Sequence, residues 1–474
     1  MDINILRQFR HDIYECFPRA KDALFNTVDA LMTETQAQSF PEVSQSLWFE
    51  RKWSSLYDAF EDGRIEEKRL RETFVRYLPN PDPGKWFWIG IDASKIARPE
   101  AVTSADRTAQ HVHNLPECRK AITFGWQFST VVVLADPASS WTYILDQQRV
   151  ASETTAIEVA CTQLKRLIAH LPKNSIVLLD RGYDANWLWC QCSTLGIGTL
   201  GRLKNNRWIS RPAPPPTGKK GSPRKDGAKL QPKDPTTHGE PDGIWKGSDA
   251  KGRPVEVTSW KHMHVQSARW LEVTVLQVVR PHATNKERDP RVSWFVWIGD
   301  QEADVAQIAL GYVLRFGQEH GYRFDKQALL WEKPRLRTPE QFERWSHIVA
   351  MAHNHLVLAR DLVEVELRQF GKQATQADPT AGATRDAQIV GPFGDPSQGT
   401  TSSRKIERPP FWGQDWQGKA VFGRSQDAKT ACAGPNLTLL LTFSSVLALF
   451  PELLATFWEG SLVYLSFAQS NDNL

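Results

Sequence analysis

Residues 176–184 read IVLLDRGYD, an apolar run that ends in a carboxylate. Four consecutive aliphatic residues are typical of a strand in the middle of a buried sheet. Asp180 follows them directly, and Gly182 favours a turn. Because a buried carboxylate is costly unless its charge is compensated, Asp180 indicates either a turn residue or part of a cation site. For an aspartate taken alone, the turn is the more usual interpretation.

The segments on either side of this stretch alternate between the two regular structures. Residues 154–171 and 186–195 have helical periodicity, as do two longer segments near the end of the region, 303–320 and 339–362. β-branched and aromatic runs predict strands at 86–91, 121–135, 141–145, 176–179, 198–203, 270–279 and 292–298. Three strands followed by a helix, a strand and a helix predict a mixed α/β fold, with a sheet flanked by helices.

The composition is that of an ordinary globular protein. Of 474 residues, 41% are hydrophobic and 24% charged, and the net charge of +4 means that a nucleic-acid surface must come from local clusters. The six cysteines form no CxxC pair, which argues for reduced thiols and against zinc. The start, MDINILRQFRHD, lacks a secretory pattern, so we expect a cytoplasmic protein.

The N-terminal residues 1–80 predict a helical domain. Apolar residues recur every three or four positions in 19–32 and 64–78. Several short helices with basic positions favour a DNA-binding domain, although a helical bundle with a solvated face explains the pattern about as well. The stretch PNPDPG at 79–84 marks its boundary.

The central and C-terminal segments differ in composition. Residues 202–261 contain fourteen Lys or Arg against six Asp or Glu, so we expect a basic, DNA-contacting insertion at 202–268 with a flexible loop, GKKGSPRKDGAK, at 218–229. The loop lacks the ending of a phosphate-binding GKS or GKT motif. We expect a disordered tail at 366–435. The apolar segment 436–474 has no uninterrupted run long enough for a membrane span, and its role is unknown.

Two predicted strands end in an aspartate. Asp92 closes WFWIGID and Asp180 closes IVLLD. If the strands are neighbours, their carboxylates stand side by side and each raises the pKa of the other. A hard divalent cation with oxygen ligands, such as Mg²⁺, removes this conflict.

A third polar feature lies on a later predicted helix. Tyr312, Arg315, Glu319 and Lys326 are spaced so that about 100° per residue puts them on one narrow stripe. The stripe is either a solvated face or a metal-ligand carboxylate flanked by phosphate-binding cations.

The pattern Tyr-x2-Arg-x3-Glu-x6-Lys, after the two strand-end aspartates, resembles the insertion-sequence DDE transposases with a YREK motif. The resemblance covers about residues 85–365 and implies a ribonuclease-H-like catalytic domain there. It implies that Asp92, Asp180 and Glu319 are catalytic metal ligands, and that Tyr312, Arg315 and Lys326 grip the phosphates of the transposon end. The 138 residues between Asp180 and Glu319 fit the DNA-contacting insertion of such enzymes.

The implied activity is cleavage at transposon ends and joining of the 3′-OH to target DNA. The implied cofactor is a pair of Mg²⁺ ions, which Mn²⁺ could replace. The implied partners are double-stranded DNA and a second copy of the chain on that DNA, and no membrane is expected. Two alternatives stay open: a decayed or domesticated protein that binds ends without cutting, and a metal-dependent nuclease without transposition.

The basic insertion supplies the remaining candidate DNA contacts. Trp208, Trp245 and Trp260 are candidates for stacking on an extruded base, although packing is the usual role of a tryptophan. The candidate nucleic-acid-binding residues in the insertion are Arg202, Lys204, Arg207, Trp208, Lys219, Lys220, Arg224 and Lys225.

Overall fold

The computed structural model of the protein describes residues 3–34, 37–79, 84–111, 122–134, 141–216, 222–283 and 291–360. The tail expected at 366–435 and the apolar segment 436–474 lie outside the described residues, as do Lys219 and Lys220. Within the described residues, no helix is long and apolar enough to cross a membrane.

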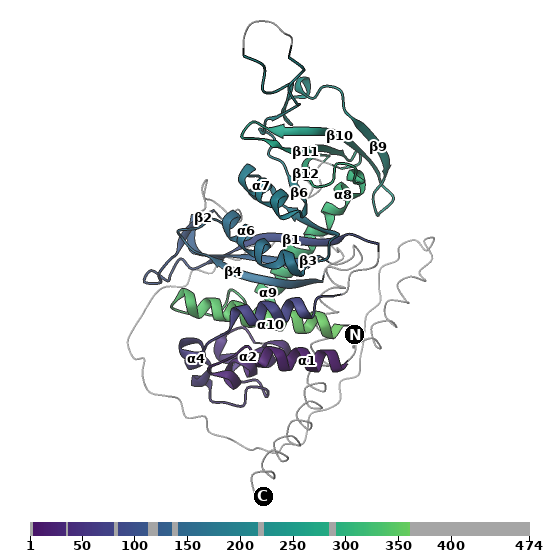
Figure 1. Ribbon diagram of the computed structural model, residues 1–474. Coiled ribbons are helices and arrows are strands. Elements are labelled where there is room, and N and C mark those ends of the chain that lie inside the picture. Colours follow the sequence, from purple (N-terminus) through teal and green to yellow (C-terminus); the bar gives the residue numbers. More distant parts are fainter. Residues whose placement is uncertain are drawn as a thin grey trace, which may run out of the picture. The chain divides into compact units, whose positions relative to one another are not determined.

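The strands of the described part form one mixed sheet (Figure 1). They are β1 (Phe87–Ala97), β2 (Thr108–His111), β3 (Ile122–Leu134), β4 (Thr142–Val150), β5 (Ser175–Leu179), β6 (Gly198–Arg202), β7 (Ile209–Ser210), β8 (Lys229–Leu230), β9 (Gly243–Ser248), β10 (Pro254–Val265), β11 (Ala268–Val279) and β12 (Val292–Ile298). All seven strands expected from the sequence are present, and β2, β7, β8, β9 and β10 are additional.

The order β4-β3-β1-β5-β6 defines the centre of the sheet. β1, β3 and β4 pair antiparallel, whereas β5 and β6 continue the sheet parallel to β1. The parallel strand β5 is buried along its whole length, as its unbroken aliphatic run predicts. This arrangement confirms the expected ribonuclease-H-like mixed sheet.

Helices cover both faces of this sheet. Ser129 of β3 bonds Gln163 of α6 at 2.7 Å, whereas Gly90 of β1 lies against Gln318 of α9. Because Gly90 pairs with Val132, and Ser129 points the opposite way from Val132 along β3, α6 and α9 lie on opposite faces.

The helices are α1 (Ile3–Tyr14), α2 (Lys21–Thr33), α3 (Phe40–Val43), α4 (Trp53–Asp62), α5 (Glu67–Arg76), α6 (Ala156–Leu167), α7 (Asn186–Leu195), α8 (Val305–Gly311), α9 (Phe316–Gln327) and α10 (Pro339–Ala359), with 3₁₀ turns η1 (Ile168–His170), η2 (Arg181–Tyr183), η3 (Pro235–Thr237) and η4 (Tyr312–Arg315).

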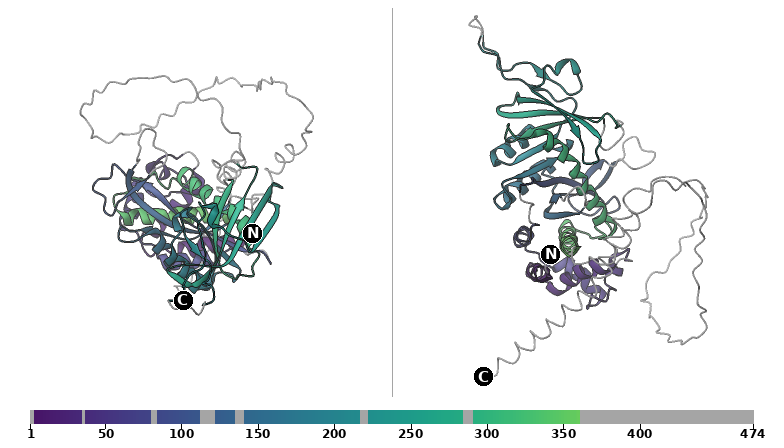
Figure 2. Two further views of the ribbon diagram at one scale, coloured as in Figure 1. Left: turned by 90° about the horizontal axis from the view of Figure 1, so that it is seen from above. Right: turned by 90° about the vertical axis from the view of Figure 1, so that its right-hand side faces the viewer.

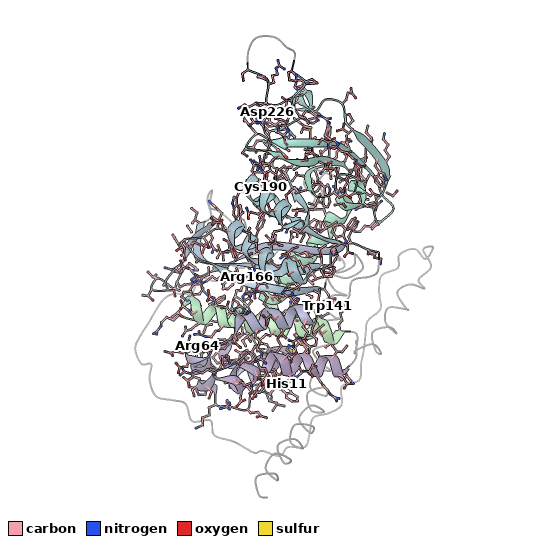
Figure 3. All side chains as sticks on the ribbon, in the orientation of Figure 1. His11, Arg64, Trp141, Arg166, Cys190 and Asp226 are labelled. Carbon is pink, nitrogen blue, oxygen red and sulfur yellow. The ribbon has the colours of Figure 1, made fainter. Side chains whose placement is uncertain are left out.

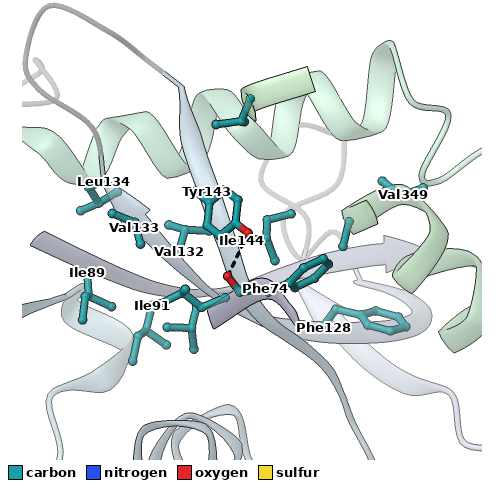
Figure 4. Close-up of a cluster of buried hydrophobic side chains, with 14 of the residues drawn as sticks. Phe74, Ile89, Ile91, Phe128, Val132, Val133, Leu134, Tyr143, Ile144 and Val349 are labelled. Atoms are coloured by element: carbon teal, nitrogen blue, oxygen red, sulfur yellow. Dashed lines mark hydrogen bonds between the residues drawn. The ribbon is translucent and has the colours of Figure 1, made fainter. Parts of the chain in front are cut away.

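The N-terminal helices share one hydrophobic core with the sheet. Helix α10 lies between β4 and the helices α1, α2 and α4 (Figures 1 and 2). Its buried face begins with a capping box, in which Thr338 and Gln341 satisfy each other's backbone N–H groups. The Tyr143 hydroxyl of β4 donates to the carbonyl of Phe74 on α5 at 2.9 Å, inside the cluster of buried side chains in Figure 4. Of the helices at 1–80, α5 therefore packs on β4, while α1, α2 and α4 pack on α10.

The segment between β6 and β12 extends the same sheet. β10 and β11 form a long antiparallel hairpin that pairs with β12, and β9 pairs with the outer edge of β10. A second apolar cluster fills this region, with Trp260 and Trp294 stacked at a centroid distance of 5.4 Å. Of these strands, the sequence analysis missed β9, which has no buried residue, and β10, whose apolar residues are interrupted by polar and charged ones.

Candidate active site

Asp92 and Asp180 are brought together by parallel pairing. Ile91 of β1 pairs with Leu179 of β5, so the two aspartates come next on neighbouring strands. One expectation was wrong: Asp92 does not end its strand. β1 continues to Ala97, because its second half pairs with β3 up to the Ala97–Gly125 pair. Asp92 therefore sits within a continuous strand, whereas Asp180 follows the last residue of β5.

The DRGYD stretch after β5 forms a locked turn. Asp180 caps the turn η2, because its Oδ1 accepts a 2.7 Å bond from the N–H of Gly182. The second aspartate, Asp184, is buried and accepts from the N–H of Lys204 at 2.8 Å and from Nε of Arg207 at 2.9 Å. Asp180 is therefore a turn residue, and its second carboxylate oxygen, Oδ2, does not take part in the bond to Gly182.

Arg315 and Glu319 come from the segment that follows β12. The single helix expected at 303–320 is instead α8, the 3₁₀ turn η4 and α9. Because a 3₁₀ helix has three residues per turn, Tyr312 and Arg315 still share one side. Gly311 lets the ring of Trp88 pack closely against this segment, since a Cβ there would lie 2.3 Å from the ring.

The guanidinium of Arg315 contacts all three acids. Its Nη1 lies 3.4 Å from Asp92 Oδ2. Its Nη2 lies 3.9 Å from Asp180 Oδ2 and 3.5 Å from Glu319 Oε1. The tertiary structure therefore gathers three carboxylates, which are far apart in the sequence, around one cation.

Burial and the neighbouring charges shift the pKa values of Asp92 and Arg315 in this cluster. Burial raises the pKa of the Asp92 carboxyl to about 6; Arg315 opposes the rise, and the Asp180 and Glu319 carboxylates add to it. Burial lowers the pKa of Arg315, but Tyr312 and the three carboxylates outweigh burial and hold it above its usual value. Three acids are thus held together in a place where their negative charges repel.

The donor set suits a hard divalent cation. Three carboxylates on separate elements offer the oxygen ligands that Mg²⁺ and Mn²⁺ accept. Among the described residues, no three His, Cys, Asp or Glu side chains stand in the close arrangement of an assembled metal site. The guanidinium of Arg315 lies between the acids. The residues fit a divalent cation in their chemistry, and Asp92, Asp180 and Glu319 are the side chains that could hold it.

The outer two residues of the Tyr-Arg-Glu-Lys pattern lie apart from the acids. Tyr312 is buried, and its hydroxyl donates to the carbonyl of Leu179 at 3.4 Å. Lys326 donates to the carbonyl of Lys95 at 2.8 Å and pairs with Glu332 at 3.6 Å. The expected single stripe is thus divided: Arg315 and Glu319 meet the aspartates, while Tyr312 supports the end of β5 and Lys326 extends along β1.

Two residues that the sequence reasoning missed hold α9 against β1 and β3. The Tyr322 hydroxyl donates to the carbonyl of Asp92 at 2.8 Å, and Gln318 Nε2 donates to the carbonyl of Thr130 at 2.9 Å. Gly90 allows this close approach, since a Cβ there would lie 2.7 Å from Gln318 Oε1. The available signal was spacing, because positions 318 and 322 lie one turn apart on the helix that carries Glu319.

The comparison with known families bears on this site. A family model described as DDE superfamily endonuclease matches residues 12–264. The chain belongs to this family. The match confirms the expected resemblance to DDE-type transposases and includes Asp92 and Asp180, but it ends before Glu319. No curated protein matches the chain.

In this member of the DDE endonuclease family, one of the candidate DNA contacts has structural partners. Arg207 pairs with the buried Asp184 and lies over the ring of Trp189 at 5.1 Å. Arg202 lies half-buried in β6, and Lys204 is exposed. Arg207 is therefore part of the fold around the DRGYD turn, whereas Lys204 is open to a ligand.

The basic loop of the DDE endonuclease is anchored at its described end. Asp226, labelled in Figure 3, accepts from Nε of Arg269 at 2.6 Å and lies 2.9 Å from Nε2 of His264. Arg224 and Lys225 precede it and are exposed. The anchor holds these two cations next to the β10–β11 hairpin.

The tryptophans separate into two groups. Trp245 packs on the main core. Trp260 is 3% exposed in the second core. The suggestion that Trp260 stacks on a base was wrong, because its ring is already buried against Trp294. Trp208 is 49% exposed. It precedes Ser210, which pairs with His264, so it lies by the turn of the β10–β11 hairpin.

Proposed function

We propose that this DDE endonuclease is a DNA transposase that cleaves at transposon ends and joins the 3′-OH to target DNA by metal-assisted phosphoryl transfer. The observation that carries the proposal is the convergence of Asp92, Asp180 and Glu319 on the Arg315 guanidinium. A structural salt bridge needs one carboxylate, and three carboxylates on one cation are an expensive arrangement for folding alone. Such an excess of negative charge favours a site that binds additional cations.

The roles of the residues follow from their chemistry. Asp92, Asp180 and Glu319 would hold two divalent ions, which supply a nucleophile and stabilise the attacking and leaving oxygens of the phosphoryl transfer. The Gly182 N–H donates to Asp180 Oδ1 at 2.7 Å, and the Ala93 N–H donates to Asp92 Oδ1 at 2.9 Å. These two bonds orient the carboxylates. Arg315 would bind the end phosphate through its planar donors.

The proposed path of the DNA includes the exposed part of the insertion. Lys204, Arg224 and Lys225 are exposed cations, and Trp208 offers an open aromatic face for a base. Lys326 would reach a phosphate farther along β1, after releasing Glu332. DNA binding by helices of residues 1–80 stays part of the proposal, as does a homodimer, because two transposon ends must be held together.

The test is cleavage of the DNA that flanks the gene. The protein is incubated with Mg²⁺ and a duplex that carries the terminal inverted repeat, and nicking is mapped at the repeat end. Cutting at the end followed by strand transfer is expected. Binding without cutting identifies an end-binding protein that no longer cleaves, and cutting of arbitrary duplexes identifies a nuclease without transposition.

Glu319 needs its own test, because the family match ends before it. Glu319→Gln and Asp180→Ala are each expected to lower the cleavage rate by at least a hundredfold, while end binding stays within about threefold. Glu302→Gln, which changes an exposed glutamate outside the cluster, is the matched control and should cleave normally. Normal cleavage by Glu319→Gln would show that the third acid lies elsewhere.

A further inference from the structure

Arg315 uses the oxygens that a metal ion would need. In both aspartates, Oδ1 accepts from a backbone N–H and Oδ2 faces Arg315. Glu319 presents Oε1 to the same guanidinium. The backbone bonds are fixed by the strand and the turn, so the Arg315 side is the one that can change.

The position of Arg315 means that its guanidinium and a divalent ion cannot both bind the three carboxylates at the same time. Its side chain is 12% exposed, while those of Asp92, Asp180 and Glu319 are 22%, 31% and 36% exposed. A divalent ion that bound the same three oxygens would stand next to the guanidinium, in a place where little water screens their repulsion. Either the ion binds weakly or the guanidinium moves away.

A DNA phosphate is the group that can draw the guanidinium away. Phosphate offers oxygens that match the fork of arginine donors, and the contact is charge-assisted. Arg315 stands where η4 joins α9, and its long side chain can turn without moving Glu319 one turn later. Lys326 lies apart from the cluster, where it bonds the carbonyl of Lys95 and pairs with Glu332.

We propose that Arg315 couples metal binding to DNA binding at this site. Its guanidinium and a divalent cation compete for Asp92, Asp180 and Glu319, and a DNA phosphate that binds Arg315 opens the carboxylates to the metal. The coupling is reciprocal, so the metal also tightens DNA binding. The inference rests on the proposed function for the identity of the phosphate, but the competition itself does not.

The first experiment measures Mn²⁺ binding without DNA, by isothermal titration calorimetry. Arg315→Gln removes the charge and keeps most of the side-chain volume, and it should bind Mn²⁺ at least fivefold more tightly than the wild type, the lower end of usual couplings between sites. Arg323→Gln removes an exposed charge from the same helix and should leave the affinity unchanged. Equal or weaker Mn²⁺ binding by Arg315→Gln overturns the proposal.

Folding is followed in the same samples by thermal melting in EDTA and in Mn²⁺. The three carboxylates repel one another without Arg315, so Arg315→Gln should melt lower than the wild type in EDTA and gain more from Mn²⁺. Should Arg315→Gln fail to fold, Arg315→Lys takes its place, since a single ammonium reaches fewer of the carboxylates. It too should bind Mn²⁺ more tightly than the wild type, and unchanged affinity would overturn the proposal.

The second experiment adds a duplex that ends at the transposon terminus and has no bond left to cut. The duplex should tighten Mn²⁺ binding by the wild type and by Arg323→Gln at least fivefold, and should have little effect on Arg315→Gln. An equal gain in all three proteins would overturn the coupling. Failure of the proposed function appears elsewhere, as absent end cleavage with the DNA-free competition intact.

Discussion

The Tyr322 hydroxyl donates a 2.8 Å hydrogen bond to the backbone carbonyl of Asp92. The bond joins α9 to β1 at the residue that is part of the acidic cluster. Glu319 lies one turn before Tyr322, so the same bond sets the distance between the acid on the helix and the acid on the strand. A contact outside the cluster therefore positions two of its members.

We expect Tyr322→Phe to lose this bond and keep the ring packing. A hydrogen bond of this kind contributes about 1 kcal/mol to the free energy of unfolding, and urea denaturation should show a loss of that size. Cleavage should slow by about tenfold, because Glu319 is less firmly placed. Tyr57→Phe, at an exposed tyrosine of α4, is the control and should change neither value. Normal cleavage by Tyr322→Phe would mean that the packing of α9 alone places Glu319.

Arg207 and the pair Arg224 and Lys225 should respond differently to mutation. Arg207→Ala leaves the carboxylate of Asp184 buried without its charged partner, and such a change costs about 3 kcal/mol of stability. The double variant of Arg224 and Lys225 to alanine should keep its stability and weaken DNA binding. Its slope of log affinity against log salt should fall by up to about 2, roughly one for each lost phosphate contact. Equal effects of both variants on folding would contradict this division.

Two tryptophans in the insertion should also separate. Trp260→Ala creates a cavity in the second core and should lower the free energy of unfolding by about 4 kcal/mol. Trp208→Ala removes an exposed ring and should change stability by less than about 0.5 kcal/mol. Its affinity for an end duplex should fall by about tenfold, as expected for one stacked base. Unchanged DNA affinity in Trp208→Ala would remove Trp208 from the proposed DNA path.

His353 should give the protein a stability that declines with pH. Its Nδ1 lies 2.7 Å from Asp325 Oδ1 and its Nε2 lies 2.8 Å from the carbonyl of Thr142, so both nitrogens have acceptors and the ring binds best as the imidazolium. Burial lowers the pKa of His353, but Asp325 and the two hydrogen bonds outweigh burial and hold it above 6.5. A raised pKa in the folded state adds stability below about pH 6.5 that is lost as the pH rises through the folded value.

The measurement is the free energy of unfolding between pH 6 and pH 9. The wild type should lose more stability over this range than His353→Gln, which cannot titrate there. His262→Gln, at an exposed histidine beside Glu272, is the control and should keep the wild-type slope. Equal slopes for the wild type and His353→Gln would show that folding does not raise the pKa of His353.

The sequence predicted most of the fold because its central elements carry strong local signals. The run before Asp180 reads as a buried strand, and its neighbours follow in the order of a mixed sheet. The strands β9 and β10 were missed, since the lysines and prolines of 202–261 resemble a loop, and only the pairing of β10 with β11 and of β9 with β10 shows that they are strands. Local composition thus predicts a strand well where an apolar run is long and unbroken, and poorly where polar residues interrupt it.

What the sequence predicted by itself was the set of three acids, and what it determined was the spacing of the Tyr-Arg-Glu-Lys residues. It also predicted that a turn follows Asp180, because Gly182 favours one. The tertiary structure decided which of these residues meet. Pairing of β1 with β5 sets the two aspartates side by side, and the 3₁₀ turn before α9 directs Arg315 between them and Glu319. Distances between carboxylates depend on strand register and helix packing, and both are set by contacts between residues far apart in the chain.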